Sequence, residues 1–452
     1  MPMKETDIKK IPAAALEIIA VLEAAGFEAW LVGGCVRDLL RGSLADDWDI
    51  ATSALPEAVQ GCFPQTVPTG LRHGTVTVLR QGRFEVTTYR AEGPYTDHRR
   101  PDGVVFVTAL EQDLARRDFT VNAMAWHPVR GLRDPFGGQR DLARRVLRAV
   151  GNPDTRFRED ALRMLRAVRF AAQLDFDIDP ATLLAITREA GSMALVSGER
   201  IRVELDKWLL AAASHRWGLF RDTGLMAVVL PELDRCFQVP QNTPWHLADV
   251  GTHSLQAAAK APRHRVVRWT LLLHDIGKAQ SRVTDAEGCD HFHGHGALSE
   301  SLAAAVLDRL RWDKATQERI LHLIRHHDRE VLPEPRAVRR AVARIGSGAF
   351  GDWLAVRRAD LAAQVPVQAQ PVLMALETVE ALWQAAEAAG ACLTVNRLAI
   401  SGRDLMALGV PQGPEVGVLL NRLLEQVLEE PALNERARLL ELAVALKLKP
   451  SL

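Results

Sequence analysis

The stretch AWLVGGCVRDLLRGSLADDWDIATS, residues 29–53, decides how the amino-terminal part of this chain folds. Its apolar start, AWLV (29–32), predicts a strand, and the pair Gly33-Gly34 predicts a tight turn into a helix. Backbone N–H groups at such a turn can approach phosphate oxygens closely. A second strand is predicted over WDIAT (48–52). This order of strand, glycine turn, helix and strand favours a phosphate-binding element.

Two acidic residues begin the second strand. Because side chains alternate along a strand, Asp47 and Asp49 are expected on one face, while Trp48 turns into the core. Neighbouring carboxylates repel each other unless a cation neutralises them, and oxygen-only ligands favour Mg²⁺ over Zn²⁺. A third acid, Glu85, lies in the predicted strand FEVTT (84–88). Two aspartates and a third acid form the arrangement that two-metal phosphoryl transfer requires, although a lone Asp-X-Asp is more often a polar loop end.

The chain changes character near residue 155. Before this point a helix is predicted over 12–25, and strands rich in Val and Thr follow the glycine turn. After it, helical periodicity continues to the end, interrupted by a polar linker near 238–246. The predicted organisation is a mixed head (1–150), a helical neck (151–237), a histidine-rich helical domain (238–370) and a helical tail (371–452).

Composition sets a few limits. Lys plus Arg equals Asp plus Glu at 56 each, so the net charge gives no argument for a nucleic-acid partner. The five cysteines form no CxxC pair, which predicts a reducing, cytoplasmic setting and no thiolate metal site. The amino terminus lacks the apolar core of a signal peptide, and no stretch has the length of a membrane span.

Six motifs in a fixed order carry a resemblance to a known family. They are LVGGCVRDLLRG, DDWDIAT, TGLRHGTVTV, FEVTTYR, RRDFTVNAMA (116–125) and REDALRMLRAVRFAAQL (158–174). Together they resemble the motifs of class II CCA-adding enzymes, in the polymerase-beta nucleotidyltransferase superfamily, with bacterial poly(A) polymerases as near relatives. The resemblance is close over about 29–215 and looser beyond. It implies an α+β fold, with a small mixed sheet in the nucleotidyltransferase head and an all-α neck, HD body and tail.

The resemblance also implies roles for the residues of the head. The substrates would be CTP and ATP, and the partner tRNA, held by shape and phosphate contacts. Asp47 and Asp49 would hold two Mg²⁺ ions, with Glu85 completing the site. The nucleotide would be bound by Gly33, Gly34, Arg37, Arg117 and Asp118, of which Arg117 and Asp118 resemble residues that hold the triphosphate and the ribose hydroxyl.

A helix predicted over 159–170 carries the candidate residues for base selection. Asp160 and Arg163 are three residues apart, so they are neighbours on a helix, and taken alone they predict only a surface salt bridge. The resemblance implies instead that they act as a protein template. A carboxylate accepts from the exocyclic amine of cytosine or adenine, and a guanidinium donates to the ring nitrogen. Arg166 and Arg169 continue the basic stripe toward phosphates.

The polar segment AEGPYTDHRRPDG (91–103) predicts a mobile loop. In the family, a flexible loop at this place is needed to add the terminal A, so its presence disfavours a CC-only enzyme. A full CCA-adding enzyme, an A-adding specialist and a poly(A) polymerase all remain open, as does a monomer or a homodimer. Two readings from other classes are an HD phosphohydrolase with an inactive head and a non-catalytic RNA-binding protein.

Ten of the fourteen histidines lie between His246 and His327, and they predict a second chemical site. The doublet His274-Asp275 ends an apolar helix in LLLHDIGK, which resembles the HD phosphohydrolases. Mixed imidazole and carboxylate ligands suit Mn²⁺, Ni²⁺ or Fe²⁺. The minimal predicted ligands are His253, His274, Asp275 and Asp360, with His295 and either His326 or His327 for a second ion. Relatives often have GHE where this chain has Gly294-His295-Gly296, which weakens the expectation of hydrolase activity.

Overall fold

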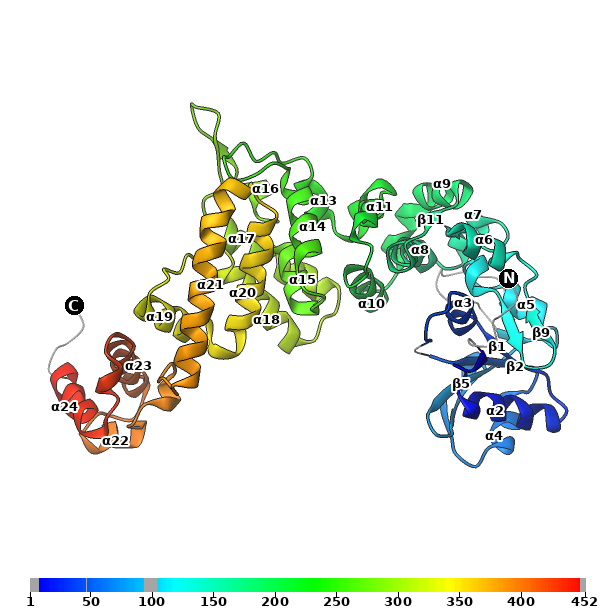
Figure 1. The fold of residues 1–452 in the computed structure, drawn as a ribbon, viewed down its shortest axis with the longest axis horizontal. Coiled ribbons are helices and arrows are strands. Elements are labelled where there is room, and N and C mark those ends of the chain that lie inside the picture. Colours follow the sequence, from blue (N-terminus) through cyan, green and yellow to red (C-terminus); the bar gives the residue numbers. More distant parts are fainter. Residues whose placement is uncertain (1–7, 46, 93–103, 448–452) are drawn as a thin grey trace. The chain divides into compact units, whose positions relative to one another are not determined.

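The computed structural model describes residues 8–45, 47–92 and 104–447. The chain divides into two compact units, Met1–Pro231 and Glu232–Leu452, and each is considered by itself. The first unit holds a sheet and a set of helices, and the second is almost entirely helical (Figure 1).

The sheet of the first unit is mixed and seven-stranded, in the order β3-β4-β5-β2-β1-β8-β9. Within this sheet β2 and β5 pair in parallel and the other five pairs are antiparallel. The predicted mixed head is therefore confirmed. The strand bounds are β1 Ala29–Val32, β2 Asp49–Thr52, β3 Thr66–Gly70, β4 Thr75–Leu79, β5 Arg83–Thr88, β8 Ala125–His127 and β9 Gly131–Arg133.

Both faces of this sheet are covered. Helices α2 (Ala13–Ala24) and α4 (Pro56–Cys62) bury their apolar residues against one face, in a core that includes Ile18, Leu31 and Ile50. On the other face, α5 (Leu110–Ala115) packs against Trp30, Val32 and Ala125. Because the central strands are buried on both sides, only the strand ends and the turns remain available for polar chemistry.

Strand pairing brings the predicted acids to one edge. Asp49 pairs with Glu85 across the parallel β2–β5 ladder and with Val32 across the β1–β2 ladder. Val32 is followed by Gly33, whose φ of +78° is accessible to glycine at little cost, and then by α3 (Gly34–Leu40). The glycine turn therefore lies beside the acids, although it is separated from them in sequence.

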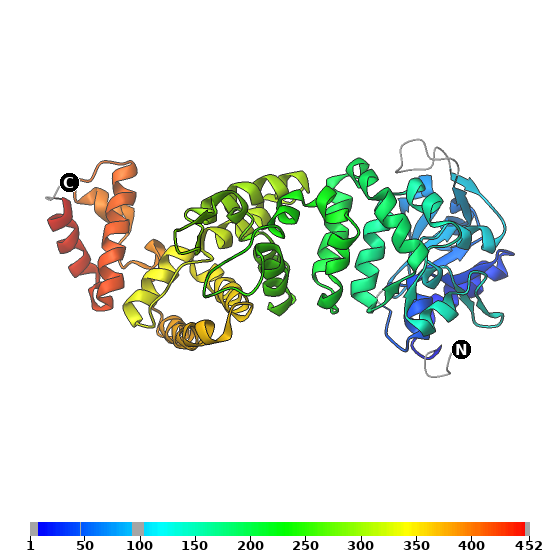
Figure 2. The ribbon, with the colours of Figure 1, turned by 90° about the horizontal axis from the view of Figure 1, so that it is seen from above.

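The neck helices depart from the prediction at one position. A single helix was expected over 159–170, but α7 (Pro153–Glu159) ends before Asp160 and α8 (Leu162–Leu174) begins after it. Asp160 has φ −143° and ψ 103°, and its Oδ1 accepts a hydrogen bond from the Leu162 amide at 3.2 Å. Aspartate side chains compete in this way for backbone donors and so interrupt helices. Helix α10 (Gly198–Leu209) then packs along α8 (Figure 2).

The second unit is a bundle of helices. Its centre is formed by α14 (Val250–Lys260), α15 (Arg265–Leu273) and α20 (Ser347–Ala362), which contact one another pairwise. The tail boundary predicted at 370/371 falls inside α21 (Pro366–Ala388), a continuous helix that packs on α20. The remaining long helices are α17 His295–Arg309, α18 Lys314–His326, α19 Pro335–Ile345, α23 Pro414–Glu429 and α24 Arg436–Lys447. Among the described residues, none of the helices has the length and apolar character needed to cross a membrane.

Candidate active site

The structure brings the three predicted acids of the head to one cavity. Asp47, Asp49 and Glu85 all line a cavity of about 790 Å³. The two aspartates also line an adjoining cavity of about 540 Å³, which contains the predicted nucleotide-binding residues Gly33, Gly34, Arg37, Arg117, Asp118, Asp160, Arg163, Arg166 and Arg169. Residues spread over more than 120 positions in sequence are thus grouped around one space.

The electrostatics of this group fit a bound divalent cation. Burial, opposed in part by the nearby Arg117 guanidinium and assisted by repulsion from Glu85 and Asp47, raises the pKa of Asp49 to about 6. The three carboxylates share a cavity, yet they do not form a compact triad with ligand atoms within 4.8 Å of one another among the described residues. Like charges without a counter-ion are expected to stay apart in this way. The donor set is oxygen only, as a hard cation such as Mg²⁺ requires.

Arg117 and the Gly33 turn form the wall next to the acids. A Cβ at Gly33 would lie 2.7 Å from the Arg117 Nη1 and 3.8 Å from the Asp49 Oδ2. The absence of a side chain therefore lets a guanidinium lie against the backbone beside a carboxylate. Arg117 is held from behind by Asp113, at 3.3 Å.

Arg37 is more constrained than its predicted phosphate-binding role suggested. Its side chain is buried, its Nη1 donates to the Asn122 Oδ1 at 2.7 Å, and its Nη2 pairs with Asp38 at 2.8 Å. Its guanidinium also lies over the Phe170 ring, 5.3 Å from the centroid. Arg37 therefore lines the cavity with its positive charge already neutralised by Asp38.

Asp118 is the centre of a buried charge network. Burial alone would raise its pKa, but the Arg166 guanidinium and the hydrogen bond from the Asn122 amide hold the pKa of Asp118 at about 2. The Arg166 Nη2 lies 2.7 Å from the Asp118 Oδ2, and its Nη1 lies 3.5 Å from Glu204. Arg169 pairs with Glu204 as well. The positive charges of Arg166 and Arg169 are thus neutralised by Asp118 and Glu204, which the sequence alone did not indicate.

Asp160 and Arg163 are both placed at the cavity, each by a different partner. The Asp160 Oδ2 accepts from the Arg200 Nη2 at 2.7 Å. Arg163 pairs with Glu159 at 2.6 Å, and its Nη2 donates to the Arg116 carbonyl at 3.1 Å. Helix α8 starts between the two residues, so Asp160 is held at a helix break and Arg163 in the first turn. Both side chains are therefore fixed from behind while they line the same space.

Helix α10 supplies three charged residues that the motif-based prediction missed. Arg200 holds Asp160, Glu204 holds Arg166 and Arg169, and Lys207 lines both cavities. These residues follow an i, i+4, i+7 spacing, which places them on one helical face. That periodicity was a usable signal in the sequence. Glu159 lies four residues before Arg163, a spacing that also predicts their contact, whereas Asn122 had no comparable signal.

The second predicted site also assembles. His253 lies on α14, His274 and Asp275 follow α15, and Asp360 lies on α20; all four are buried. The His253 Nε2 is 2.9 Å from the Asp360 Oδ1, and the His274 Nε2 is 3.1 Å from the Asp275 Oδ2. His253, His274 and Asp275 place one ligand atom each within 4.8 Å of one another. Nitrogen and oxygen donors in this mixture fit a transition-metal ion.

A second group shares Asp275. Its Oδ1 lies 3.4 Å from the His295 Nε2 and 3.6 Å from the His327 Nε2, and these three residues form another compact triad. Of the two alternatives at 326 and 327, the structure places His327 in the group, whereas His326 lies against the His322 ring at 4.8 Å. The two Asp275 oxygens thus face two separate sets of imidazoles.

Three further residues at this site were not predicted. The Lys278 Nζ lies 2.7 Å from the Asp275 Oδ2 and donates to the Gln241 Oε1 at 2.9 Å. The His246 ring lies 5.0 Å from the ring of His253. Although burial alone would raise it, the pKa of Asp275 is held well below its ordinary value by His274 and Lys278, so the carboxylate is ionised and able to bind a cation.

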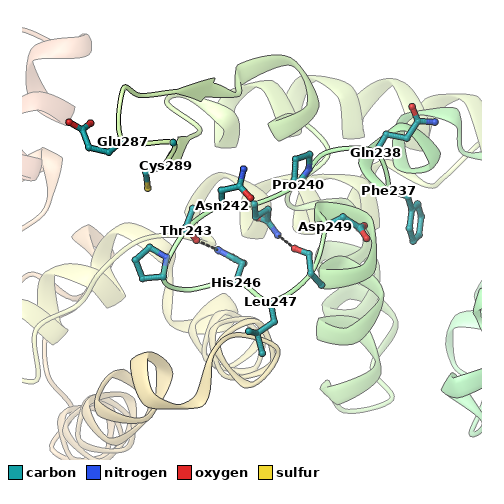
Figure 3. Close-up of a pocket in the computed structure, with 14 residues that line it drawn as sticks. Phe237, Gln238, Pro240, Asn242, Thr243, His246, Leu247, Asp249, Glu287 and Cys289 are labelled. Carbon is teal, nitrogen blue, oxygen red and sulfur yellow. Dashed lines mark hydrogen bonds between the residues drawn. The ribbon is translucent and has the colours of Figure 1, made fainter.

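A cavity of about 700 Å³ adjoins this second site (Figure 3). One wall is the loop over 237–249, where the Thr243 hydroxyl and the His246 Nδ1 are 2.9 Å apart. Glu287, Gly288 and Cys289 form another part of the lining. The segment near 238–246, predicted as a linker, is irregular as expected, but it lines a cavity.

Comparisons with known proteins agree with this arrangement. Residues 29–148 match the family model described as the poly A polymerase head domain, 175–237 match the probable RNA and SrmB-binding site of polymerase A, and 246–364 match the HD domain. The CCA-adding enzyme of Geobacillus thermodenitrificans is 46% identical over 59% of this chain and 64% of its own length, just under two thirds.

Several relatives align over nearly the whole chain. The CCA-adding enzyme of Levilactobacillus brevis is 36% identical over 94% of this chain and 96% of its own length. The crystal structure of the Bacillus stearothermophilus CCA-adding enzyme in complex with CTP is 31% identical, covers 98% of both chains and has a TM-score of 0.75. A relative of this identity and coverage, together with the head, polymerase and HD matches, shows that this chain belongs to the family of CCA-adding enzymes.

Proposed function

We propose that this chain adds C and A nucleotides to the 3′ end of tRNA without a nucleic-acid template, using CTP and ATP and releasing pyrophosphate. The observation that carries the proposal is the pairing of Asp49 with Glu85 in a cavity that also contains Asp47 and adjoins the space around Asp160 and Arg163. The full-length similarity to CCA-adding enzymes, one of them solved with CTP, supports the same reaction.

The carboxylates of Asp47, Asp49 and Glu85 would hold Mg²⁺, which when bound lowers the pKa of the primer 3′-hydroxyl and neutralises charge on the triphosphate. Next to them, the amino-terminal end of α3 would offer backbone N–H groups to a phosphate, although the Gly33 N–H itself donates to the Met124 carbonyl at 3.2 Å. Arg117 lies close enough to this turn to contact a phosphate bound there. Asp118, kept ionised by Arg166, is suited to accept a hydrogen bond from a ribose hydroxyl.

Base selection would follow from hydrogen-bond complementarity. Cytosine and adenine both present an amine beside an acceptor nitrogen, which matches the Asp160 carboxylate and the Arg163 guanidinium. Uracil and guanine present a carbonyl and a ring N–H, so each would leave two groups without partners, at about 1–3 kcal/mol apiece. Since Arg200 and Glu159 fix the two side chains, the pair is preorganised for this test.

We also propose a role for each of the other parts of the chain. Residues 1–150 form the nucleotidyltransferase head, 151–237 the neck, 238–370 the HD domain and 371–452 a tail that contacts tRNA. Two transition-metal ions such as Mn²⁺, Ni²⁺ or Fe²⁺ would bind at the HD residues and support an accessory phosphohydrolase activity, because the donors there are mixed nitrogen and oxygen. The protein would act in the cytoplasm, on tRNA.

The decisive experiment supplies tRNA ending before CC, before A, or complete, with CTP and ATP added separately. Addition of CC and then A identifies a full CCA-adding enzyme, addition of A alone identifies an A-adding specialist, and a long tail identifies a poly(A) polymerase. The segment over 91–103, on which that distinction depends, lies outside the described residues from 93 onward. The Asp47→Ala variant should lose nucleotide addition while binding tRNA almost as the parent does. Incorporation near the parent rate would overturn the metal assignment.

A further inference from the structure

A short hairpin in the second unit gathers three metal-ligating side chains outside both sites described above. Strand β12 (Val283–Thr284) pairs with β13 (Asp290–His291), with Val283 opposite His291. The turn between them is closed by a hydrogen bond from the Asp285 amide to the Cys289 carbonyl at 2.9 Å. The Cys289 amide in turn donates to the Asp285 Oδ1 at 2.8 Å. The turn therefore holds residues 285 and 289 next to each other.

The side chains of Asp285, Cys289 and His291 converge. One ligand atom from each lies within 4.8 Å of the other two, and the Asp285 Oδ2 is 2.7 Å from the His291 Nε2. The side chains of His291 and Asp285 are 44% and 32% exposed, so an ion can reach them from solvent. None of these residues belongs to the His253–Asp275–His327 groups.

The chemistry of this donor set differs from that of either described site. A thiolate, an imidazole and a carboxylate together suit a borderline-soft divalent ion such as Zn²⁺ rather than Mg²⁺. The His293 ring is stacked on that of His291, with centroids 5.7 Å apart, and adds a second imidazole beside the group. Around tetrahedral Zn²⁺, nitrogen and oxygen ligands lie about 3.3 Å apart, so the 2.7 Å separation of the Asp285 Oδ2 and the His291 Nε2 must widen by about 0.6 Å when the ion binds.

We propose that this hairpin binds one divalent transition-metal ion of the zinc type through Asp285, Cys289 and His291, leaving a coordination position for water or an incoming ligand. Binding would release the thiol proton of Cys289 to solvent, and the Nε2 proton that His291 donates to Asp285 would pass through solvent to its own Nδ1, which leaves the Nε2 lone pair for the ion. The sequence-based expectation of no thiolate site considered only Cys–Cys spacing. A Cys-X-His pair closed by a turn aspartate also brings a thiol, an imidazole and a carboxylate together, without any CxxC spacing.

The ion would stabilise one wall of the 700 Å³ cavity. Cys289 and Glu287 line this cavity opposite the loop over 242–246 (Figure 3). Asp290 ties the hairpin to that loop, since its Oδ2 accepts from the Asn242 amide at 2.9 Å and its own amide donates to the Asn242 carbonyl at 3.0 Å. A metal ion bound to the hairpin would therefore hold the rim of the cavity in place, although no residue of the HD site binds that ion.

The test is titration of the metal-free full-length chain with Co²⁺, followed by optical absorption, because a Co²⁺–thiolate bond gives a charge-transfer band that imidazole and carboxylate ligands do not. The parent protein is expected to develop this band, and Cys289→Ser and His291→Ala are expected to lose it. Cys62→Ser, a half-buried cysteine of the head, and His274→Ala, at the HD site, should keep it. Adding Zn²⁺ to the Co²⁺-loaded parent protein should abolish the band, because Zn²⁺ displaces Co²⁺ and has no such absorption.

Metal content gives an independent readout. After equilibrium dialysis against Zn²⁺, Cys289→Ser should hold about one equivalent less than Cys62→Ser, and both variants should melt at the parent temperature in chelator, which shows that the hairpin still folds. A parent protein without the thiolate band, a band that persists in Cys289→Ser, or a band lost in His274→Ala would each overturn the proposal. In those cases the cluster is a hydrogen-bonded turn only, or the thiolate belongs to another site.

Discussion

At the residue scale, the proposed role of the Asp160 carboxylate in nucleotide choice can be tested by substitution. Replacing it by alanine removes the acceptor for the amine of cytosine and adenine, and equally removes the penalty against the carbonyl of uracil. We expect the preference for CTP over UTP, measured as a ratio of kcat/KM values on a tRNA ending before CC, to fall about 5- to 150-fold, the equivalent of about 1–3 kcal/mol.

Asp154→Ala is the matched control for this substitution, because Asp154 lies on the preceding helix α7 and pairs with Arg188 at 2.7 Å, away from the cavity lining. Its CTP-to-UTP ratio should stay at the parent value. An unchanged ratio in Asp160→Ala itself would show that base choice depends on other groups.

Asp49 links the proposed metal site of the head to the stability of the fold. Its pKa of about 6 in the metal-free fold exceeds the ordinary value of 3.8, so the folded state binds this proton more tightly than the unfolded state does. The associated stability is therefore present below pH 3.8 and lost as pH rises through 6. In chelator at pH 8, the free energy of unfolding of Asp49→Asn should exceed that of the parent by up to about 3 kcal/mol, so the variant should melt at a higher temperature, and near pH 4 the two should differ little.

Magnesium supplies the counter-test for Asp49. Saturating Mg²⁺ at pH 8 should raise the melting temperature of the parent and narrow its gap to Asp49→Asn, since a bound cation removes the repulsion among the acids. If the parent and Asp49→Asn melt at the same temperature in chelator at pH 8, the Asp49 carboxylate does not destabilise the metal-free fold.

At the element scale, α10 supports the cavity that contains Asp160 and Arg163. Glu204 is 4% exposed and pairs with both Arg166 and Arg169, so Glu204→Ala would leave two guanidiniums buried with one fewer acid. We expect a loss of about 3–5 kcal/mol in the free energy of unfolding of the first unit. Glu199→Ala, at an exposed position in the first turn of the same helix, should change it by less than about 0.5 kcal/mol. Similar melting of the two variants would contradict this role for Glu204.

The elements also show what the sequence could predict. The strands and helices around Gly33 and Asp49 were predictable, because apolar runs and glycine turns are local signals. The pairing of Asp49 with Glu85 was not, because register is set by packing of distant strands. The break at Asp160 was missed because a side-chain hydrogen bond to the Leu162 amide outweighed helical periodicity. The compensation of Arg166 by Asp118 depends on two elements far apart in sequence.

At the scale of the whole molecule, the two predicted chemistries belong to different compact units: the head acids to Met1–Pro231 and the HD ligands to Glu232–Leu452. The boundary inside the second unit can be tested by truncation. Helix α21 buries Leu376 and Val379, and its Trp383 ring lies 5.2 Å from that of Phe350 on α20. A tail that starts at 371 would therefore separate residues that pack together.

A chain that ends at 390 keeps α21 complete and should retain the far-ultraviolet helical signal and cooperative melting of the second unit, although it loses the contacts of α23 with α19. It should bind tRNA more weakly than the full chain, because the proposed tail contact is gone. A chain that ends at 370 removes most of α21 and exposes the apolar face of α20, so its second unit should melt well below that of the longer truncation. Equal melting of the two truncations would show that α21 belongs to the tail rather than to the bundle, as the sequence had suggested.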